Sequence, residues 1–454
     1  MKLFKFSTMK YLKLLSFLAV ICLINSCSKD VMMEPQTDGS TNSNDLLKSG
    51  KMSLNIAVVS DIHYLAASLL RNDAANGAAF QAYLAADPKL IEYSIPILDE
   101  VVSKLEREKP DILLIPGDLT KDGEKLSHLA VAKILHRLAS EGIKVFVIPG
   151  NHDINNPQSK GYRGQNSYNT ETVSPERFAA IYDEFGYWNA KYRDPHSLSY
   201  ICQVKSDLWI LGIDDCKYDQ NVGASEPVVS GKIKPETMHW IKEKMKIANK
   251  AKVNVLAMMH HGIMEHYIGQ EQLDPGYVVD DWQTVAPELM EAGIQVFFTG
   301  HYHANDITEL QSNGKTLYDI ETGSLVSTPS PYRLMKYTGN ALNIRTERVE
   351  SIHAKIPNGL SFVEYSTLFH QQHFDGYFGY YLQLKGLDET TAAYFAPRFR
   401  NAIMAHYAGD EQITPDEQLQ VDELLGVSQE LWGAVMTLWK DLPPMDNKIL
   451  LDLK

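Results

Sequence analysis

The sequence predicts a layered α/β fold, and two observations support this prediction. Short apolar runs typical of buried strands alternate with segments whose apolar residues recur at the three- and four-residue spacing of amphipathic helices. The chain of 454 residues is long enough for two or three domains, or for one large catalytic domain with an additional segment. No internal repeat interrupts the alternation, so we expect one main α/β domain.

Composition and charge exclude several classes of protein. Hydrophobic residues make up 44% and charged residues 22% of the chain, which is ordinary for a globular protein and excludes a disordered, fibrous or polytopic membrane protein. The formal net charge is -14 at pH 7. Such a charge repels polyanions, so no general nucleic-acid binding is expected.

The amino-terminal segment is predicted to be an export signal. Lysines precede the apolar run 14–24, and small and polar residues follow it before Cys27. This run is too short to cross a bilayer, which takes about 20 residues. The sequence Leu23–Cys27 resembles a lipoprotein signal, in which the cysteine is acylated; secretion with an incidental cysteine is the alternative. We expect residues 1–26 to be a signal peptide and residues 27–50 a flexible tether. The protein would then be an exported bacterial lipoprotein, anchored to a membrane in the periplasm or at the cell surface.

Residues 51–354 carry the pattern expected of the catalytic domain. The expected strands are 54–60, 112–116, 145–149, 253–259 and 294–299. The expected helices are 89–108, 126–138, 175–185, 235–248 and 284–291. The connection 64–88 is rich in alanine and has little strand character, so we expect a lid-like insertion or a short helix there.

Residues 355–454 are predicted to form a helical cap that packs on the catalytic domain. A final strand is expected over 340–352, and helices are expected over 363–370, 390–407, 417–425 and 429–439. The sequence Thr414-Pro415-Asp416-Glu417 is that of a capping box with proline at the first helical position. The many aromatic residues of this segment are expected to form its core.

Two cysteines remain beyond the expected signal peptide and lipidation site. A hairpin centred on 205–207 would place Cys202 opposite a residue near 210, and not opposite Cys216. Two buried free thiols are therefore preferred, although an oxidising compartment would allow a disulfide.

Each of the five expected strands is followed by residues of the types that bind metal ions. In chain order these are Asp61-Ile62-His63, Gly117-Asp118, Gly150-Asn151-His152-Asp153, His260-His261 and Gly300-His301-Tyr302-His303. Each motif alone is also common in turns, helix caps and loops, but five of them in the same strand context indicate a site. Ligands of α/β sheets bind outside the carboxyl ends of the strands, so we expect the motifs to converge at one edge.

In this order the motifs resemble those of the calcineurin-like metallophosphoesterases, over residues 54–350. The resemblance implies a four-layer α/β/β/α sandwich and a hydrolase with two metal ions. It places one ion on Asp61, His63, Asp118 and His303, and the other on Asp118, Asn151, His260 and His301. His152 would be a general acid for the leaving oxygen, oriented by Asp122 or Asp153; a phosphate-binding or structural imidazole is the alternative.

The chemistry of these residues agrees with a two-metal site. Two cations a few ångströms apart repel each other, so a carboxylate and a hydroxide must lie between them. Imidazole and carboxylate ligands favour Mn, Fe or Zn. His260 and His261 compete for one position, because successive side chains at a strand end point to opposite faces; His260 directly follows the apolar run and is preferred. Lys121 stands where purple acid phosphatases have a tyrosine, so a ferric tyrosinate centre is not expected.

The sequence therefore predicts a phosphoesterase that attacks a small phosphomonoester or phosphodiester with a metal-bridging hydroxide. A nuclease acting on small oligonucleotides is one alternative, and a non-catalytic binding lipoprotein that keeps the fold is another. Arg163 and Arg333 are considered as substrate contacts, with solvated surface as the preferred interpretation of each.

Overall fold

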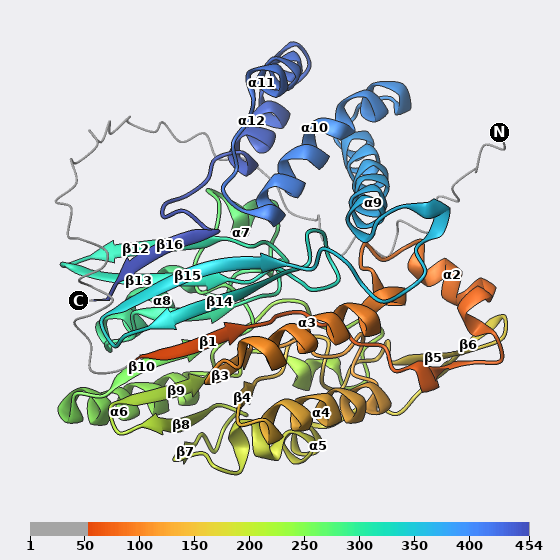
Figure 1. Ribbon diagram of the computed structural model, residues 1–454. Coiled ribbons are helices and arrows are strands. Elements are labelled where there is room, and N and C mark those ends of the chain that lie inside the picture. Colours follow the sequence, from red (N-terminus) through yellow and green to blue (C-terminus); the bar gives the residue numbers. More distant parts are fainter. Residues whose placement is uncertain (1–52, 454) are drawn as a thin grey trace.

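The computed structural model describes residues 53–453 (Figure 1). The expected signal peptide, the tether and Cys27 lie outside these residues. Over the described part of the chain, no helix combines the length and the apolar character needed to cross a bilayer.

A six-stranded sheet contains the first three predicted strands. The strand order is β16-β15-β14-β1-β3-β4. These strands are β1 (Leu54–Val58), β3 (Ile112–Ile115), β4 (Lys144–Val147), β14 (Pro331–Tyr337), β15 (Ala341–Arg348) and β16 (Lys448–Asp452). The strands β1, β3 and β4 are parallel, whereas β14, β15 and β16 extend the sheet by antiparallel pairing.

A seven-stranded sheet contains the other two predicted strands. Its order is β12-β13-β11-β10-β9-β8-β7. The strands are β7 (Tyr192–Arg193), β8 (Tyr200–Lys205), β9 (Leu208–Gly212), β10 (Asn254–Met258), β11 (Val296–Thr299), β12 (Ile307–Ser312) and β13 (Lys315–Glu321). The neighbours β9, β10, β11 and β13 are parallel. A small third sheet is formed by β2 (Leu70–Arg71), β5 (Lys160–Arg163) and β6 (Asn166–Asn169).

Alternating side chains of the second sheet enter two different cores. Leu208 and Ile210 of β9 belong to the core that includes the first sheet. Trp209 and Leu211 belong to a separate core with α6 (Pro235–Ala251) and α8 (Trp282–Glu291). Strands buried on both faces are typical of parallel sheets covered by helices.

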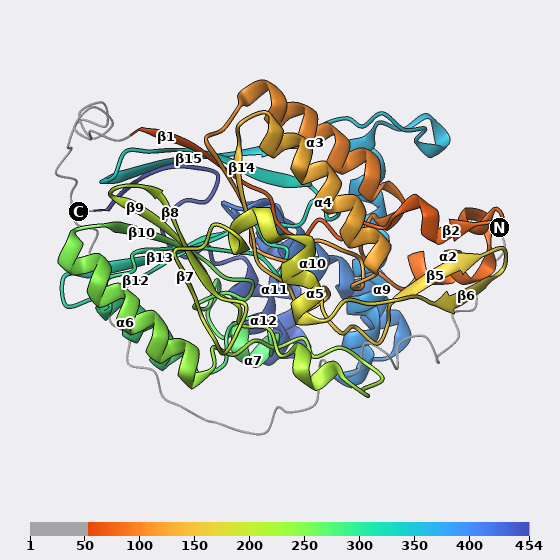
Figure 2. The same cartoon turned by 90° about the horizontal axis from the view of Figure 1, so that it is seen from below.

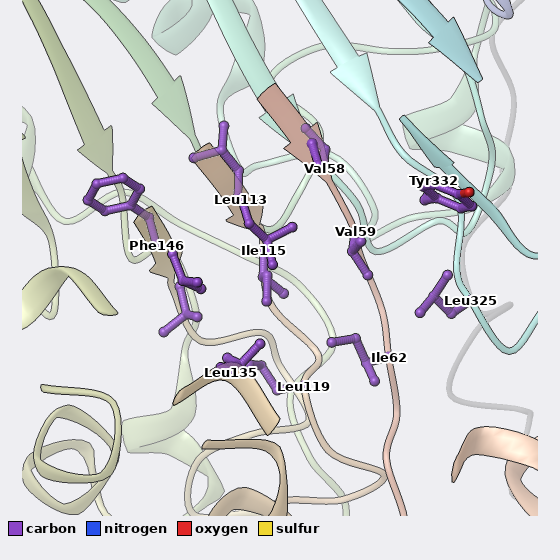
Figure 3. Packing of buried hydrophobic residues seen from close by; sticks show 14 of the residues in the cluster. Val58, Val59, Ile62, Leu113, Ile115, Leu119, Leu135, Phe146, Leu325 and Tyr332 are labelled. Carbon is purple, nitrogen blue, oxygen red and sulfur yellow. The ribbon is translucent and has the colours of Figure 1, made fainter. Parts of the chain in front are cut away.

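The first sheet has its own layer of helices. Figure 2 shows α3 (Ser94–Glu108) and α4 (Lys125–Ser140) side by side. Figure 3 shows Leu135 of α4 beside Leu119, beyond the end of β3 that carries Ile115, and all three belong to the same core. Two sheets between two helical layers confirm the predicted α/β/β/α sandwich.

One predicted helix of the sandwich is shorter than expected, and the connection 64–88 contains the expected short helix. The helix expected over 175–185 ends early, as α5 (Pro175–Ile181), and a tight turn with Gly186 at a φ of 121° follows it. The connection 64–88 contains β2, the short helix α2 (Ala78–Leu84) and two single turns of 3-10 helix, η3 (Ala67–Leu69) and η4 (Ala74–Asn76).

The carboxyl-terminal helices gather on one side of the molecule, in blue in Figure 1. They are α9 (Phe362–Leu384), α10 (Glu389–Ala408), α11 (Pro415–Asp422) and α12 (Gln429–Leu438). Their aromatic residues form a core of their own, which Tyr267 and Tyr302 of the catalytic sandwich join. The capping box at Thr414 is present, with its side chain accepting from the backbone N–H of Glu417.

Two features of this region depart from the expected pattern. Helix α9 is far longer than 363–370, because its buried face continues through Phe374, Phe378 and Leu382. The prediction that 355–454 is helical is also wrong for β16, which pairs with β15 at the end of the first sheet. Its backbone satisfies the N–H and C=O groups that β15 would otherwise leave exposed at a sheet edge.

Both remaining cysteines are free and buried. In the β8–β9 hairpin Cys202 lies opposite Ile210, as the position of the turn predicts. The Cys202 thiol donates to the backbone oxygen of Gly186, and the Cys216 thiol donates to that of Pro149.

Candidate metal centre

The predicted motifs converge where the carboxyl ends of the two sheets meet. The first three follow β1, β3 and β4, and the last two follow β10 and β11 of the second sheet. Two groups of potential metal ligands result, and each group combines residues that are far apart in the chain. The first contains Asp61, His63 and His303, and the second contains Asp118, His260 and His301.

The first group has nitrogen and oxygen atoms directed at one another. The Nε2 atoms of His63 and His303 lie 3.2 Å apart. His303 Nε2 is 3.5 Å from Asp61 Oδ1 and His63 Nε2 is 3.5 Å from Asp118 Oδ2. His303 Nδ1 lies 3.0 Å from the hydroxyl of Ser327, a contact that orients the ring and leaves Nε2 for a metal ion.

The second group is built around His260. Its Nδ1 donates to the backbone oxygen of Pro116 at 2.8 Å, which leaves Nε2 facing Asn151 Oδ1 at 3.0 Å and Asp118 Oδ1 at 3.6 Å. Acceptor atoms that face one another this closely need a proton or a cation between them. Asp118 therefore directs one oxygen at each group, Oδ2 toward His63 and Oδ1 toward His260.

His261 points elsewhere. Its Nδ1 lies 2.9 Å from Asp215 Oδ2 and its Nε2 lies 2.7 Å from the backbone oxygen of Val229. Both ring nitrogens are engaged in these contacts, so His260 is the histidine of this pair that faces Asp118.

The backbone of the cluster is strained. Positive φ angles occur at Asp61 (49°), His63 (44°), Asp118 (48°), His301 (76°) and His303 (70°). Residues with a Cβ atom rarely adopt this left-handed conformation, which costs about 1 kcal/mol or more for each residue. Strain of this kind concentrates at functional sites.

The glycines of two motifs allow a close approach of carboxylates. A Cβ atom on Gly150 would lie 2.2 Å from Asp118 Oδ1, and one on Gly300 would lie 2.3 Å from Asp61 Oδ2. No side chain fits at either position unless the neighbouring ligand moves.

His152 lies beside both groups, and Asp122 orients it. Its Nδ1 donates to Asp122 Oδ1 at 2.9 Å, while its Nε2 lies 4.0 Å from Asp118 Oδ2. Asp153 instead accepts from the backbone N–H groups of Gly150, Leu119 and Thr120. Of the two carboxylates considered from sequence, Asp122 therefore contacts the imidazole, and Asp153 organises the loop.

The electrostatic surroundings of His152 favour its protonated form. Burial lowers the pKa of His152, but the negative charge of Asp118 and the hydrogen bond to Asp122 raise it overall to about 9. Asp122 is itself paired with Lys121, which is fully buried and also contacts Glu124 at 3.1 Å. Sequence reasoning missed this chain of charges, although the close spacing of Lys121, Asp122 and Glu124 was visible.

The protonation states of His63, His301 and Asp61 fit metal binding. Burial lowers the pKa of His63 and of His301 well below the usual range, so both imidazoles are neutral and keep a lone pair. Burial opposes the charge of Asp61, but its hydrogen bond with His303 holds the pKa of this carboxyl below its ordinary value. Neutral imidazoles and ionised carboxylates are the forms that bind metal ions. His63 Nδ1 is buried and has no hydrogen-bond partner among residues 53–453.

A model of the calcineurin-like phosphoesterases matches residues 54–305, which is more than half of the chain. The chain belongs to the calcineurin-like phosphoesterase family. This membership confirms the resemblance that the sequence motifs carry. The matched range covers all five motifs of the metal centre.

Other comparisons of this calcineurin-like phosphoesterase give more distant similarities. A probable cyclic nucleotide phosphodiesterase of Vesicomyosocius okutanii is 39% identical over 59 residues, which are 13% of this chain and 24% of that relative. The solved structure of a dimetal phosphatase from Danio rerio aligns with a TM-score of 0.45 and 11% identity, over 65% of this chain and 96% of the other. A purple acid phosphatase from yellow lupin seeds aligns with a TM-score of 0.40 and 11% identity, over 65% of this chain and 52% of the other.

The two arginines considered as substrate contacts lie away from the cluster. Arg163 is exposed on β5. Arg333, for which solvated surface was preferred, is fully buried in β14, and its guanidinium donates to the backbone oxygens of Glu321, Asp306 and Asp446. The interpretation of Arg333 as solvated surface is wrong, because β14 is buried on both faces over residues 331–335.

Proposed function

We propose that this phosphoesterase hydrolyses a small phosphoester with two metal ions that share Asp118. The observation that carries the proposal is the position of the Asp118 carboxylate, which directs its two oxygens at two different groups of ligands. Asp61, His63 and His303 would complete one site, and Asn151, His260 and His301 would complete the other. Four imidazoles, two carboxylates and an amide oxygen favour Mn, Fe or Zn.

His152 is proposed to donate a proton to the leaving oxygen. Two bound divalent ions would polarise the phosphoryl oxygens and lower the pKa of the attacking water. The chain's own contribution is the imidazole, which Asp122 holds through Nδ1 so that Nε2 faces the Asp118 side of the site. The hydrogen bond from Nδ1 to Asp122 would favour the protonated imidazole, which is the form that can give a proton to the leaving oxygen.

Phosphodiesters are the substrates that we propose to test first. The relative named as a probable cyclic nucleotide phosphodiesterase supports this choice. Two aromatic rings also border the ligand histidines, with Tyr277 at 4.6 Å from His301 and Tyr407 at 6.4 Å from His303, measured between ring centroids. Aromatic faces at this position would favour substrates with a flat, apolar leaving group.

We also propose that the enzyme is exported and anchored to a membrane by a lipid on Cys27. The support is the order of lysines, a short apolar run and a small-residue site before Cys27, followed by the polar segment 28–47. A tether of this composition would hold the catalytic domain clear of the lipid headgroups.

The test is hydrolysis of bis(p-nitrophenyl) phosphate by protein that is stripped of metal and then reloaded with Mn²⁺, Fe²⁺ or Zn²⁺. We expect activity only after reloading, and we expect Asp118→Asn to lose both hydrolysis and most of one metal ion. Asp219→Asn removes an exposed carboxylate that pairs with Lys234 and serves as the control.

Full activity with two ions per chain in Asp118→Asn would overturn the proposal that Asp118 is a shared ligand. Metal binding without hydrolysis of any phosphoester would favour the non-catalytic alternative.

A further inference from the structure

A second cluster of potential metal ligands lies where the carboxyl-terminal helices meet the catalytic sandwich. We call it the junction cluster, and it consists of Asp306, His406 and Glu411. Asp306 directly precedes β12, His406 lies in the last turn of α10, and Glu411 follows that helix. Their side chains are 0%, 2% and 1% exposed, so water does not solvate them.

The three side chains direct their polar atoms at one another. His406 Nδ1 lies 3.6 Å from Asp306 Oδ2 and forms a short contact with Glu411 Oε1. Within residues 53–453, Asp306 Oδ2, Glu411 Oε2 and His406 Nε2 have no hydrogen-bond partner. Buried polar atoms are nearly always paired, so the unpaired carboxylate oxygens of Asp306 and Glu411 indicate a missing partner.

The nearby positive side chains of His266 and Arg333 bond to other atoms and do not pair with the unpaired oxygen of Asp306. His266 donates from Nδ1 to the other oxygen of Asp306 at 2.6 Å, and its Nε2 is directed at Asp319 and Glu321, at 3.2 and 3.6 Å. The guanidinium of Arg333 donates to backbone oxygens and to the hydroxyl of Thr346, and its hydrogen bonds do not reach the unpaired oxygen of Asp306.

The carboxylates also outnumber the positive side chains. Five carboxylates are buried in this region, and three groups can carry positive charge there, namely His266, His406 and Arg333. The carboxylates are those of Asp306, Asp319, Glu321, Glu411 and Asp446. Unpaired negative charge is costly inside a protein, and either a bound cation or protons must compensate it.

We propose that the junction cluster binds a third divalent metal ion, Zn²⁺ or Mn²⁺, through Asp306, His406 and Glu411. One imidazole and two carboxylates suit these ions better than Ca²⁺ or Mg²⁺, which prefer oxygen alone. The ion would be structural, because it joins the end of α10 and the following loop to the first residue before β12. It would be independent of the catalytic ions, whose ligands do not include these residues.

Metal counting in the full-length protein tests the proposal. The background is a variant with an emptied catalytic centre, Asp61→Asn, Asp118→Asn and His260→Gln, which is loaded with Zn²⁺ and desalted over a chelating resin. We expect one Zn²⁺ per chain by elemental analysis, and none after Glu411→Gln is added. Glu411→Gln is isosteric, and Glu430→Gln, which removes the exposed partner of Lys385, is the matched control.

Each result of these measurements either supports or overturns the proposed third metal site. A background variant without Zn²⁺ would overturn the proposal and show that protons compensate the carboxylates. Zn²⁺ that persists after Glu411→Gln would also overturn it, because the ion would then lie elsewhere. Thermal unfolding of the background variant is a second measurement that does not depend on Glu411→Gln folding: Zn²⁺ should raise the Tm, and an unchanged Tm would contradict the site. None of these measurements uses hydrolysis, so they stand apart from the proposed activity.

Discussion

Single side chains set the chemistry of the candidate catalytic centre. The His152 imidazole lies between Asp122, which holds Nδ1, and Asp118, which is 4.0 Å from Nε2. Lys121 in turn pairs with Asp122 although it is fully buried. A buried lysine is stable only with such partners, so Lys121 both depends on Asp122 and fixes its position beside the imidazole.

Replacement of His152 separates proton donation from metal binding. Because a poor leaving group needs a proton and p-nitrophenolate does not, His152→Ala should lower kcat about a hundredfold on an alkyl phosphoester. It should lower kcat much less on a p-nitrophenyl ester, with both metal ions retained. Steady-state kinetics and elemental analysis on the same preparation measure both effects.

Asp122→Asn is the matched variant, because it keeps the imidazole and removes the charge that orients it. It should show the same preference for good leaving groups to a smaller degree. An equal loss on both substrates in His152→Ala, with metal retained, would mean that His152 binds phosphate and does not donate the proton.

The close approach at Gly150 gives a second prediction at this scale. A methyl group would lie 2.2 Å from Asp118 Oδ1, so Gly150→Ala must displace the shared carboxylate. We expect at least a tenfold loss of kcat/KM and a lower metal content. Gly433→Ala in α12 adds the same methyl group where no atom lies within 4 Å, and it should remain active. A fully active Gly150→Ala would show that Asp118 can move without consequence.

At the scale of helices and strands, hydrophobic periodicity predicts those elements whose apolar residues recur regularly and without interruption. Five strands were predicted because each is an unbroken apolar run, namely β1, β3, β4, β10 and β11. The motifs that follow these strands could then be interpreted as a site from their position at the strand ends. The strand β16 was missed because it is short and follows a long helical region. The extent of α9 was missed because polar residues separate its buried aromatic positions.

The junction cluster shows why part of the chemistry could not be predicted. Asp306, His406 and Glu411 follow no local spacing, and Asp306 is a hundred residues from the other two. Only the packing of α10 against the start of β12 brings them together. The proposed catalytic ligands come from equally distant segments, but each lies in a recognisable motif at a strand end.

Helix α4 contributes a buried histidine that should make stability depend on pH. Burial lowers the pKa of His128 to about 4, and its ring contacts Asp153 O at 2.8 Å and the Tyr182 hydroxyl at 2.9 Å. The folded pKa lies below the unfolded value of about 6.5, so the unfolded chain binds more protons between these values. Stability is complete above about pH 6.5 and falls as the pH drops toward 4.

Urea unfolding at pH 8 and pH 5 measures this effect. His128 should account for about 2 kcal/mol of the free energy of unfolding lost between the two pH values, and His128→Gln should reduce the loss by that amount. His136 is exposed on the same helix and provides the control. An equal reduction in His136→Gln would show that burial of His128 is not the cause.

At the scale of the whole molecule, the carboxyl-terminal helices contact both the segment 64–92 and the candidate metal centre. His373 of α9 lies 3.2 Å from the backbone oxygen of Leu84, and Tyr365 donates to Glu92 at 2.6 Å. Tyr407 of α10 contacts the ring of the proposed ligand His303. Substrate selection should therefore depend on both segments. Neither segment has the alternation of strands and helices that forms the sandwich.

The proposed anchor gives a prediction for the complete protein in its cell. If Cys27 is acylated, the native protein should remain with membranes in a carbonate wash and should need detergent for extraction. Cys27→Ser should remove the acyl group and release the protein. Equal membrane retention of both forms would contradict lipidation, and Cys202→Ser, which changes a buried thiol, is the control.

The left-handed backbone at five of the proposed ligand residues has an evolutionary consequence. Natural selection for hydrolysis must maintain Asp61, His63, Asp118, His301 and His303 in a conformation that weakens the fold. Glycine at any of these positions would relieve the strain and destroy the ligand. A lineage freed from the need for hydrolysis would therefore lose these residues early, and its descendants would gain stability as they lost activity. Inactive descendants with this fold should accordingly melt at a higher temperature than the metal-free form of this enzyme.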